Sequence, residues 1–324
     1  MRIAITGGSG ALGHALISRL THDGTDRIVT LTRDEQRRAQ LHAEFGGYPG
    51  FRVYAGDIRD KDRLVDIFGG VEIIIHAAAR KVVNGAPDEV EEIFHTNLVG
   101  TRNVIAAARL AGVQKLIFIS SDKACHAESQ AYGLSKAFAE KLVVAANAVT
   151  FSRGLRLSVL RYGNVLASTG SVIVRWREQI TRGEPIAVSD ERMTRFWLSV
   201  DQAVEHVLTA IRIMKGGEVM VPHVPAAPLM RLAQALSPDG SEPRVVISGI
   251  RSGGEKIHEQ LLSADETRRA RRWQGMYVVP PDIPPDARWD TSPWLGECVP
   301  EDLLYRSDVW EYQAMVEDLR RLLR

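Results

Sequence analysis

The chain has 324 residues, with 41 lysines and arginines against 40 aspartates and glutamates, so its formal net charge is +1. This balance provides no overall field that would favour nucleic acid or a membrane surface as a partner. Two cysteines, Cys125 and Cys298, are too few for a disulfide framework and favour a reduced, cytoplasmic location. We expect no metal site, no signal peptide and no membrane span.

A strand, a glycine loop and a helix are predicted between residues 2 and 20. Gly7, Gly10 and Gly13 recur at three-residue spacing in the loop. Without Cβ atoms they permit a tight turn, a close approach to a pyrophosphate and tight packing of the helix on a sheet. The helix N-terminus adds partial positive charge there. The pattern predicts a dinucleotide-binding loop, to which we also assign Ser9, Ala11 and Leu12.

Apolar runs typical of buried parallel strands follow at 27–33, 51–57, 71–79, 115–121 and 155–165, with helical patterns between them. This alternation predicts an α/β fold with a doubly wound, Rossmann-type parallel sheet. We expect residues 1–165 to form the main part of the dinucleotide-binding domain.

Beyond residue 165 the pattern becomes irregular and richer in proline. Residues 166–324 are predicted to form mainly a smaller substrate-binding portion, with some segments returning to the sheet. A closing helix is expected at about 308–324. The basic cluster at 268–272 is interpreted as a solvated helix face rather than a nucleic-acid site.

The place where an acidic residue would select NAD is occupied by Arg33. Its guanidinium, with that of Arg37 one helical turn further on, suits a ribose 2′-phosphate. We therefore expect NADP. The alternative is that Arg33 only pairs with Asp34 or Glu35 at the surface.

Two further segments are assigned to the cofactor. Asp57, followed by Ile58, ends the third predicted strand and can accept a hydrogen bond from an adenine amino group. Ala77, Ala78 and Ala79 end the fourth strand with small side chains, as the backbone beside a cofactor requires. Simple packing explains these alanines equally well.

Tyr132 and Lys136 lie four residues apart, on one face of a predicted helix. The charge of Lys136 can lower the pKa of the phenol while its ammonium holds a cofactor ribose. Tyr132 would then act as a base towards a substrate hydroxyl. This pair follows a strand ending in Ser120 and Ser121, a context in which coincidence is a weak explanation.

These motifs, with "SSDKA", "AYGLSK", "MTRFW" and "GGEKIHE", give the chain a family resemblance. The sequence resembles the extended short-chain dehydrogenases/reductases and, among them, the inverting UDP-N-acetylglucosamine 4,6-dehydratases of polysaccharide and pseudaminic acid biosynthesis. The resemblance covers nearly the whole chain. It implies a nucleotide-sugar substrate, a tightly bound NADP that is regenerated within each cycle, and a homo-oligomer.

The same resemblance implies the catalytic roles. Tyr132 would deprotonate the C4 hydroxyl, Asp122 would protonate the leaving C6 hydroxyl, Lys123 would remove the C5 proton, and Ser121 could bond the C4 oxygen. A lysine suits the base role only where burial or a nearby positive charge lowers its pKa. Without the resemblance, Asp122 and Lys123 could equally be a surface turn.

The resemblance also implies ligand-binding residues. Lys81, Thr96 and Asn97 would line the cofactor and the sugar, although Asn97 often has a purely structural role. The nucleotide diphosphate would be held by Asn164, Thr169, Val172, Ile173, Arg195 and Arg251. Arginines give bidentate contacts to phosphate oxygens, while ordinary ion pairs are the alternative for the two arginines.

Two segments depart from the family pattern. Residues 124–131 and 251–256 are each one residue longer than expected, so the sugar or the nucleotide could differ from UDP-N-acetylglucosamine. Cys125 or His126 could contact it, or simply fill the loop. Two other functions on the same fold also stay open: a nucleotide-sugar epimerase or reductase, and a non-catalytic NADP-binding regulatory protein.

Overall fold

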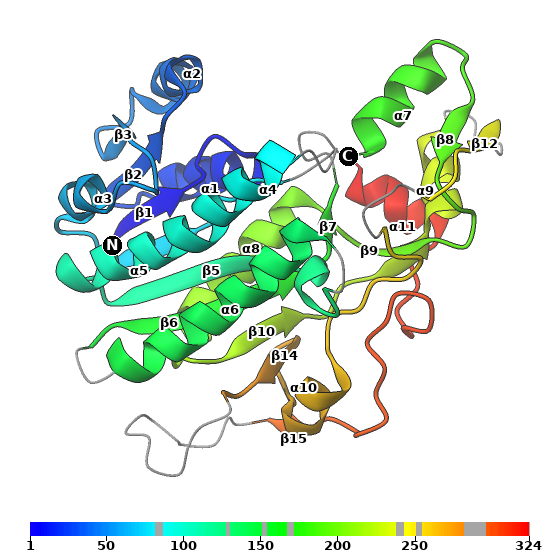
Figure 1. The fold of residues 1–324 in the computed structure, drawn as a ribbon. Coiled ribbons are helices and arrows are strands. Elements are labelled where there is room, and N and C mark those ends of the chain that lie inside the picture. The colour runs from blue at the N-terminus through cyan, green and yellow to red at the C-terminus, as the bar shows by residue number, and fades with distance from the viewer. Residues whose placement is uncertain are drawn as a thin grey trace.

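The computed structural model describes residues 1–81, 87–127, 130–150, 154–166, 172–237, 243–250, 255–281 and 296–323. Strands and helices alternate through the first half of the chain (Figure 1). The elements of the main sheet and its layers are β1 (Arg2–Thr6), α1 (Ala11–His22), β2 (Arg27–Thr32), α2 (Glu35–Phe45), β3 (Phe51–Ala55), α3 (Lys61–Phe68), β4 (Ile73–His76), α4 (Pro87–Ile93), the π-helix η1 (Phe94–Val99), α5 (Gly100–Leu110), β5 (Lys115–Ser121), the 3-10 helix η2 (Asp122–Ala124), α6 (Ala131–Thr150), β6 (Arg156–Tyr162), α8 (Val200–Ile213), β10 (Val219–Pro222), α10 (Ala264–Arg269), β13 (Arg271–Trp273), β14 (Met276–Val279) and β15 (Glu297–Cys298).

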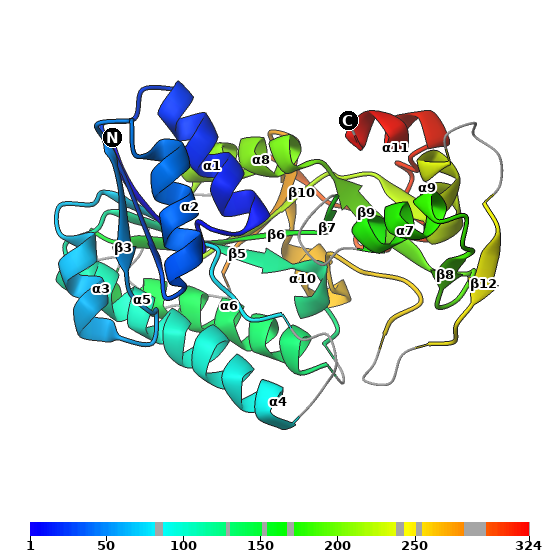
Figure 2. The same ribbon diagram turned by 90° about the horizontal axis from the view of Figure 1, so that it is seen from above.

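The main sheet has the strand order β15-β13-β14-β10-β6-β5-β4-β1-β2-β3. Pairing is parallel from β3 across to β10 and antiparallel from β10 to β15. Helices α1, α2 and α8 lie on one face and α3, α5 and α6 on the other (Figure 2). The central strands are buried on both sides, which explains their continuous apolar runs. The predicted doubly wound fold class is confirmed.

A smaller portion lies beyond the carboxyl ends of β5 and β6 (Figures 1 and 2). It has its own apolar core around Trp176, with a three-stranded sheet β11-β9-β7 and a two-stranded sheet β12-β8. Its elements are β7 (Asn164–Val165), α7 (Val172–Thr181), β8 (Ile186–Val188), β9 (Thr194–Leu198), β11 (Ala226–Pro228), α9 (Leu229–Leu236), β12 (Val245–Ile247) and α11 (Val316–Leu322).

Two local expectations are wrong. The closing helix, α11, spans only Val316–Leu322, because the preceding segment makes isolated bridges and side-chain contacts to β9 and β11 instead of helical turns. The basic cluster at 268–272 is only partly helical, since Arg271–Trp273 pairs with β14 as a strand. No helix in the described ranges is long and apolar enough to cross a membrane.

Candidate active site

The glycine loop lies between β1 and α1, against the end of β4. Gly7 has a φ of +79°, and a Cβ there would lie 2.8 Å from the backbone nitrogen of Ala78. A Cβ on Gly13 would lie 2.3 Å from the carbonyl oxygen of Gly7. Helix α1 begins after Gly10 with no side-chain cap on its first N–H groups. The loop therefore fits a pyrophosphate, which would take those donors.

The other residues assigned to this loop lie where a bound dinucleotide could meet them. Ser9 precedes α1, while Ala11 and Leu12 form its first turn. Ala77 and Ala78 are partly buried beside Gly7, and Ala79 follows them. Ile58 is buried and packs towards Gly100, so its described contacts belong to the core.

Arg33 follows β2 and is half exposed. Its Nη1 lies 3.5 Å from Asp57 and 3.9 Å from Glu92, rather than against Asp34 or Glu35. Arg37 lies 3.5 Å from Asp34. Both guanidinium groups are at the sheet edge where an adenosine ribose would lie in a fold of this class.

The carboxylate of Asp57 is already occupied by arginine. Arg59 donates to it from its backbone N–H, from Nε at 3.0 Å and from Nη2 at 2.8 Å. Burial opposes ionisation, but these hydrogen bonds and the charges of Arg59 and Arg33 lower the pKa of Asp57. An adenine amino group would therefore meet an ionised acceptor that is shared with two arginines.

Asn97 ties the segment after β4 to α6. Its Oδ1 accepts from the backbone N–H of Arg80 at 2.7 Å, and its Nδ2 donates to Ser135 at 2.9 Å. These contacts fit the structural alternative for Asn97. Thr96 next to it has a buried hydroxyl without a hydrogen-bond partner among the described residues.

Lys81 was also expected beside the cofactor and the sugar. Desolvation by neighbouring protein atoms, together with the charge of Lys123, lowers the pKa of Lys81.

Tyr132 and Lys136 lie in the first turns of α6. Lys136 Nζ donates to the carbonyl of Ile119 at 2.7 Å and lies 4.4 Å from the centre of the Phe118 ring. Burial, with the charge of Lys81, lowers the pKa of Lys136 to about 7. The pKa of Tyr132 is raised by burial and by the charge of Asp122. The expected lowering of the phenol pKa is therefore absent in this structure, because burial and the charge of Asp122 both raise it.

Asp122 and Lys123 follow β5, at the carboxyl edge of the sheet. Asp122 is fully buried, and its Oδ1 accepts from Lys123 Nζ at 2.9 Å and from Ser121 Oγ at 2.7 Å. Lys123 Nζ also donates to Oδ1 of Asn164 at 2.8 Å. Asp122 and Lys123 therefore form a bonded pair inside the protein rather than a surface turn, with Asn164 as a shared partner.

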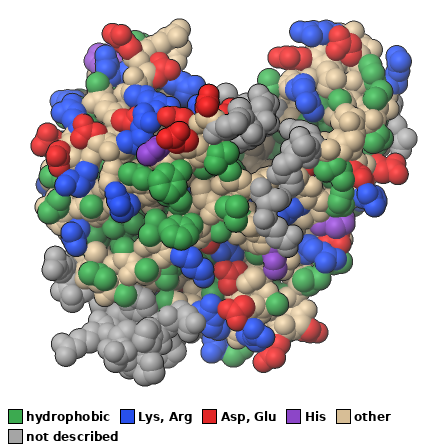
Figure 3. Space-filling model, in the orientation of Figure 1, with side chains coloured by type: hydrophobic (Ala, Val, Ile, Leu, Met, Phe, Trp, Pro, Cys, Tyr) green, Lys and Arg blue, Asp and Glu red, His purple; other side chains and the backbone are tan. Residues whose placement is uncertain are grey.

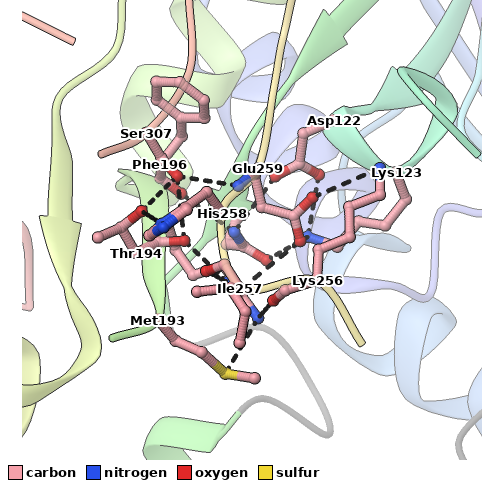
Figure 4. Close-up of polar contacts among 12 residues, drawn as sticks. Asp122, Lys123, Met193, Thr194, Phe196, Lys256, Ile257, His258, Glu259 and Ser307 are labelled. Atoms are coloured by element: carbon pink, nitrogen blue, oxygen red, sulfur yellow. Dashed lines mark hydrogen bonds and ion pairs between the residues drawn. The ribbon is translucent and has the colours of Figure 1, made fainter. Parts of the chain in front are cut away.

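Glu259 completes this cluster from a distant part of the chain. Its Oε1 lies 3.4 Å from Lys123 Nζ and 3.6 Å from Arg195 Nε, and its Oε2 lies 4.0 Å from Lys256 Nζ. Figure 4 shows Asp122, Lys123 and Glu259 turned towards one another. The side chain of Glu259 is 4% exposed. A buried carboxylate thus faces three cations beside Asp122.

The electrostatics of the cluster reverse one expectation. Burial lowers the pKa of Lys123, but the charges of Asp122 and Glu259 outweigh burial and raise it. Burial and Glu259 raise the pKa of Asp122 despite Lys123. Against burial, Lys123, Arg195 and Lys256 lower the pKa of Glu259. Lys123 therefore lacks the lowered pKa that its expected role as a base called for.

The residues expected at the diphosphate are dispersed. Asn164 contacts the acid–base pair, and Arg195 donates to the carbonyls of Thr194, Ile257 and Lys256. Ile173 is buried in the smaller core, against which Val172 packs. Thr169 and Arg251 lie outside the described residues. A phosphate contact by Arg195 would need one of its present partners to be released, so that role stays a prediction.

The two segments that depart from the family pattern meet here. Lys256 Nζ donates to the carbonyl oxygen of Cys125 at 2.5 Å. The next residue, His126, has a positive φ of +51°. Cys125 is buried, and this burial is the main reason why the pKa of its thiol is raised to about 12. The thiol is therefore inert at neutral pH.

Sequence reasoning missed Glu259. It lies in the quoted motif "GGEKIHE", so that motif was the available signal, but nothing in it indicates contact with Lys123. No group of three or more histidine, cysteine or acidic side chains in the described part of the chain is arranged to hold a metal ion.

Comparison with known proteins agrees with the predicted resemblance. Residues 3–281 match the family model described as polysaccharide biosynthesis protein. An inverting UDP-N-acetylglucosamine 4,6-dehydratase of Campylobacter jejuni is 38% identical over 87% of this chain and 83% of its own length. A UDP-glucose 4-epimerase of Rickettsia rickettsii is 35% identical over 86% and 83%.

Among solved structures, the X-ray structure of Pen from Bacillus thuringiensis has a TM-score of 0.88 and 29% identity, covering 99% of this chain and 96% of that one. The family match and the Campylobacter relative each span more than four fifths of this chain. The protein therefore belongs to the polysaccharide biosynthesis protein family, on the extended short-chain dehydrogenase/reductase fold.

Proposed function

We propose that the protein is a lyase, an NADP-dependent nucleotide-sugar 4,6-dehydratase that inverts C5 of UDP-N-acetylglucosamine or a similar sugar. The observation that supports this most directly is the hydrogen-bonded pair of the buried Asp122 and the partly buried Lys123, near Tyr132 at the carboxyl edge of the sheet. Elimination of water needs an acid and a base on one sugar, together with a group that activates C4. These three side chains supply that set.

The glycine loop would hold the pyrophosphate of the cofactor, and Arg33 with Arg37 would hold the 2′-phosphate of NADP. When bound, the nicotinamide would supply the hydride-transfer chemistry that links C4 and C6. The choice of NADP rests on the two arginines, since a neutral ribose hydroxyl would gain less from them.

The chain's own groups carry the proton transfers. Tyr132 must be a phenolate to take the proton of the C4 hydroxyl. The positive charges of Lys136 and of a bound nicotinamide would favour that form against the burial that raises its pKa. The resulting C4 ketone acidifies the C5–H bond. Lys123 removes the C5 proton while Asp122 gives a proton to the C6 oxygen, so the C6–O bond breaks and water leaves. A proton from solvent then adds to the opposite face of C5, which balances the hydride added at C6 and inverts that centre.

The raised pKa of Lys123 is compatible with this chemistry because its ammonium is bonded to Asp122. Transfer of one proton along that 2.9 Å hydrogen bond gives a neutral amine and a carboxylic acid. Those are the forms that elimination requires. The overall charge of the pair does not change, so a buried site can accommodate the transfer.

We also propose a homo-oligomer. Hydrophobic side chains gather on the face formed by α5 and α6 (Figure 3). The half-exposed residues Phe94, Leu134 and Phe138 lie on η1 and α6. A second copy of the chain would remove these side chains from water. The cytoplasmic location expected from the two cysteines stays a prediction.

Mass spectrometry of the purified protein incubated with UDP-N-acetylglucosamine and NADP tests the activity. We expect the sugar to lose one water. When the reaction is run in deuterated water, we expect deuterium at C5, and proton NMR should show the inverted configuration there. A panel of other nucleotide sugars tests whether the substrate differs. Absence of water loss throughout the panel would reject the proposal.

An epimerase is the second candidate, because the Rickettsia relative with that name is 35% identical. It would change stereochemistry without changing mass. The same incubation therefore separates the two candidates in one spectrum. A reductase, by contrast, would consume the reduced cofactor stoichiometrically, and a regulatory protein would only bind it.

A further inference from the structure

Glu259 is a buried carboxylate that the chemistry above does not use. Its Oε1 faces Lys123, and its Oε2 has no hydrogen-bond partner within the described ranges. Burying a carboxylate is costly unless its charge is compensated. The cations of Lys123, Arg195 and Lys256 provide this compensation, and one of them belongs to the acid–base pair.

The position of Glu259 is fixed by several elements. Its backbone N–H donates to Ser307 Oγ, which is also bonded to Thr194 of β9. Arg195 of β9 donates to the carbonyls of Lys256 and Ile257, which holds the segment before Glu259 in place. The carboxylate is therefore held against Lys123 by a network that includes β9 and the region around Ser307 (Figure 4).

We propose that Glu259 is a positioning residue for the dehydration step: its carboxylate holds the Lys123 ammonium beside Asp122 and sets the charge of this acid–base pair. The inference rests on the proposed function. Glu259 acts through Lys123 and Asp122 and needs no contact with the sugar.

The charge of Glu259 acts on both members of the pair in the same direction. It stabilises the ammonium of Lys123 and disfavours a negative charge on Asp122, so it raises the pKa of each. The other charged groups around Glu259 are Arg195 of β9 and Lys256 of its own segment, while the neighbouring His258 lies 3.8 Å from Asp308. Removal of the negative charge should therefore lower both pKa values.

Glu259→Gln tests this with almost no change in shape. If Lys123 must be neutral and Asp122 protonated, both limbs of the bell-shaped pH profile should move to lower pH, by about one unit. Because Lys123 is then no longer held beside Asp122, exchange of the C5 proton should slow while oxidation at C4 continues. Reduced nicotinamide should then accumulate, visible by its absorbance. A role confined to structure would not shift both limbs.

Glu218→Gln is the matched control. Glu218 is also buried, but it lies just before β10, where its carboxylate accepts a hydrogen bond from Ser158 of β6. Thermal unfolding of both variants shows whether each is folded. We expect the control to keep the wild-type pH profile. A Glu259→Gln profile that coincides with that of the folded control would overturn the inference.

A measurement without turnover separates this inference from the proposed function. Proteins carrying lysine labelled with ¹³C at Cε are titrated by NMR, with Lys123→Met assigning the signal. We expect Glu259→Gln to lower the pKa of Lys123 by about one unit. An unchanged titration would reject the role of Glu259, whereas absence of dehydration by the wild type would reject only the proposed function.

Discussion

Arg161 joins three elements behind the active site and gives the sharpest stability prediction. It lies on β6, buried between Glu140 of α6 and Glu266 of α10. Its Nε donates to Glu140 at 2.9 Å, and its two Nη atoms donate to Glu266 at 2.8 Å. Nη1 also donates to the carbonyl of Leu261 at 2.9 Å. Helix α6, which holds Tyr132, is thereby tied to the chain that follows Glu259.

The magnitude follows from Glu266. Although burial opposes it, the charge and hydrogen bonds of Arg161, followed by hydrogen bonds from Ser263, hold the pKa of Glu266 at about 2, against an ordinary 4.5. At about 1.4 kcal/mol per unit, this difference corresponds to about 3 kcal/mol. Because the folded pKa is the lower one, the contribution is present above pH 4.5 and is lost as the pH falls through 2.

Arg161→Met should therefore destabilise the protein by about 3–5 kcal/mol at pH 7, since two carboxylates lose their compensating charge. For a chain of this length that lowers Tm by about 4–7 °C. The deficit should shrink between pH 7 and pH 5, as the uncompensated carboxylates take up protons. Adding Glu140→Leu and Glu266→Gln should restore most of the stability.

Urea unfolding followed by circular dichroism at several pH values provides the assay. A loss below about 1 kcal/mol at pH 7 would show that the cluster contributes little net stability. A stability deficit that stays constant from pH 7 to pH 5 would refute the electrostatic reasoning. The loss of van der Waals packing around the Arg161 side chain would then explain the whole effect.

Three further predictions concern the site and the surface. Lys123→Ala should keep cofactor binding but abolish exchange of the C5 proton with solvent deuterium, measured by NMR; undiminished exchange would reject Lys123 as the base. Arg33→Ala should weaken NADP binding about tenfold to a hundredfold and NAD binding little, measured by calorimetry; equal weakening would contradict the choice of NADP, and Arg38→Ala is the control. Phe138→Glu should dissociate the proposed oligomer in analytical ultracentrifugation, whereas Val309→Glu should not. If the Phe138 variant sediments like the wild type, the proposed interface on α6 is wrong.

Much of the fold was predictable because its signals are local. The glycine loop, the apolar strands and the pair Tyr132 and Lys136 are each read from fewer than about twenty consecutive residues. The strand 115–121 was predicted with the bounds that the structure has. Asp122 and Lys123 were assigned from the family resemblance, because from the residues alone a surface turn was an equal alternative. They directly follow the predicted strand 115–121, at the strand end where parallel sheets place their active sites.

The rest depends on contacts between distant segments. Asn164 was assigned to the diphosphate, yet its amide bridges Lys123 and Asp122 from β7, which pairs with β9 in the three-stranded sheet. Arg195 was expected to be free for phosphate, but the segment that contains Glu259 supplies carbonyls for its donors. No pattern in the sequence specifies either arrangement, since both depend on tertiary packing.

The sign of the Lys123 pKa shift changes how the base must work. A lysine with a lowered pKa would be a free amine before substrate binds, whereas Lys123 is held as an ammonium by two carboxylates. In the proposed mechanism the base would then form within the pair, when Asp122 takes the Lys123 proton, so acid and base would become competent in the same event. A lone amine could remove the C5 proton without an acid ready at C6. Under the proposal, coupling the two through one hydrogen bond would let the C5 proton leave only when C6 can lose water.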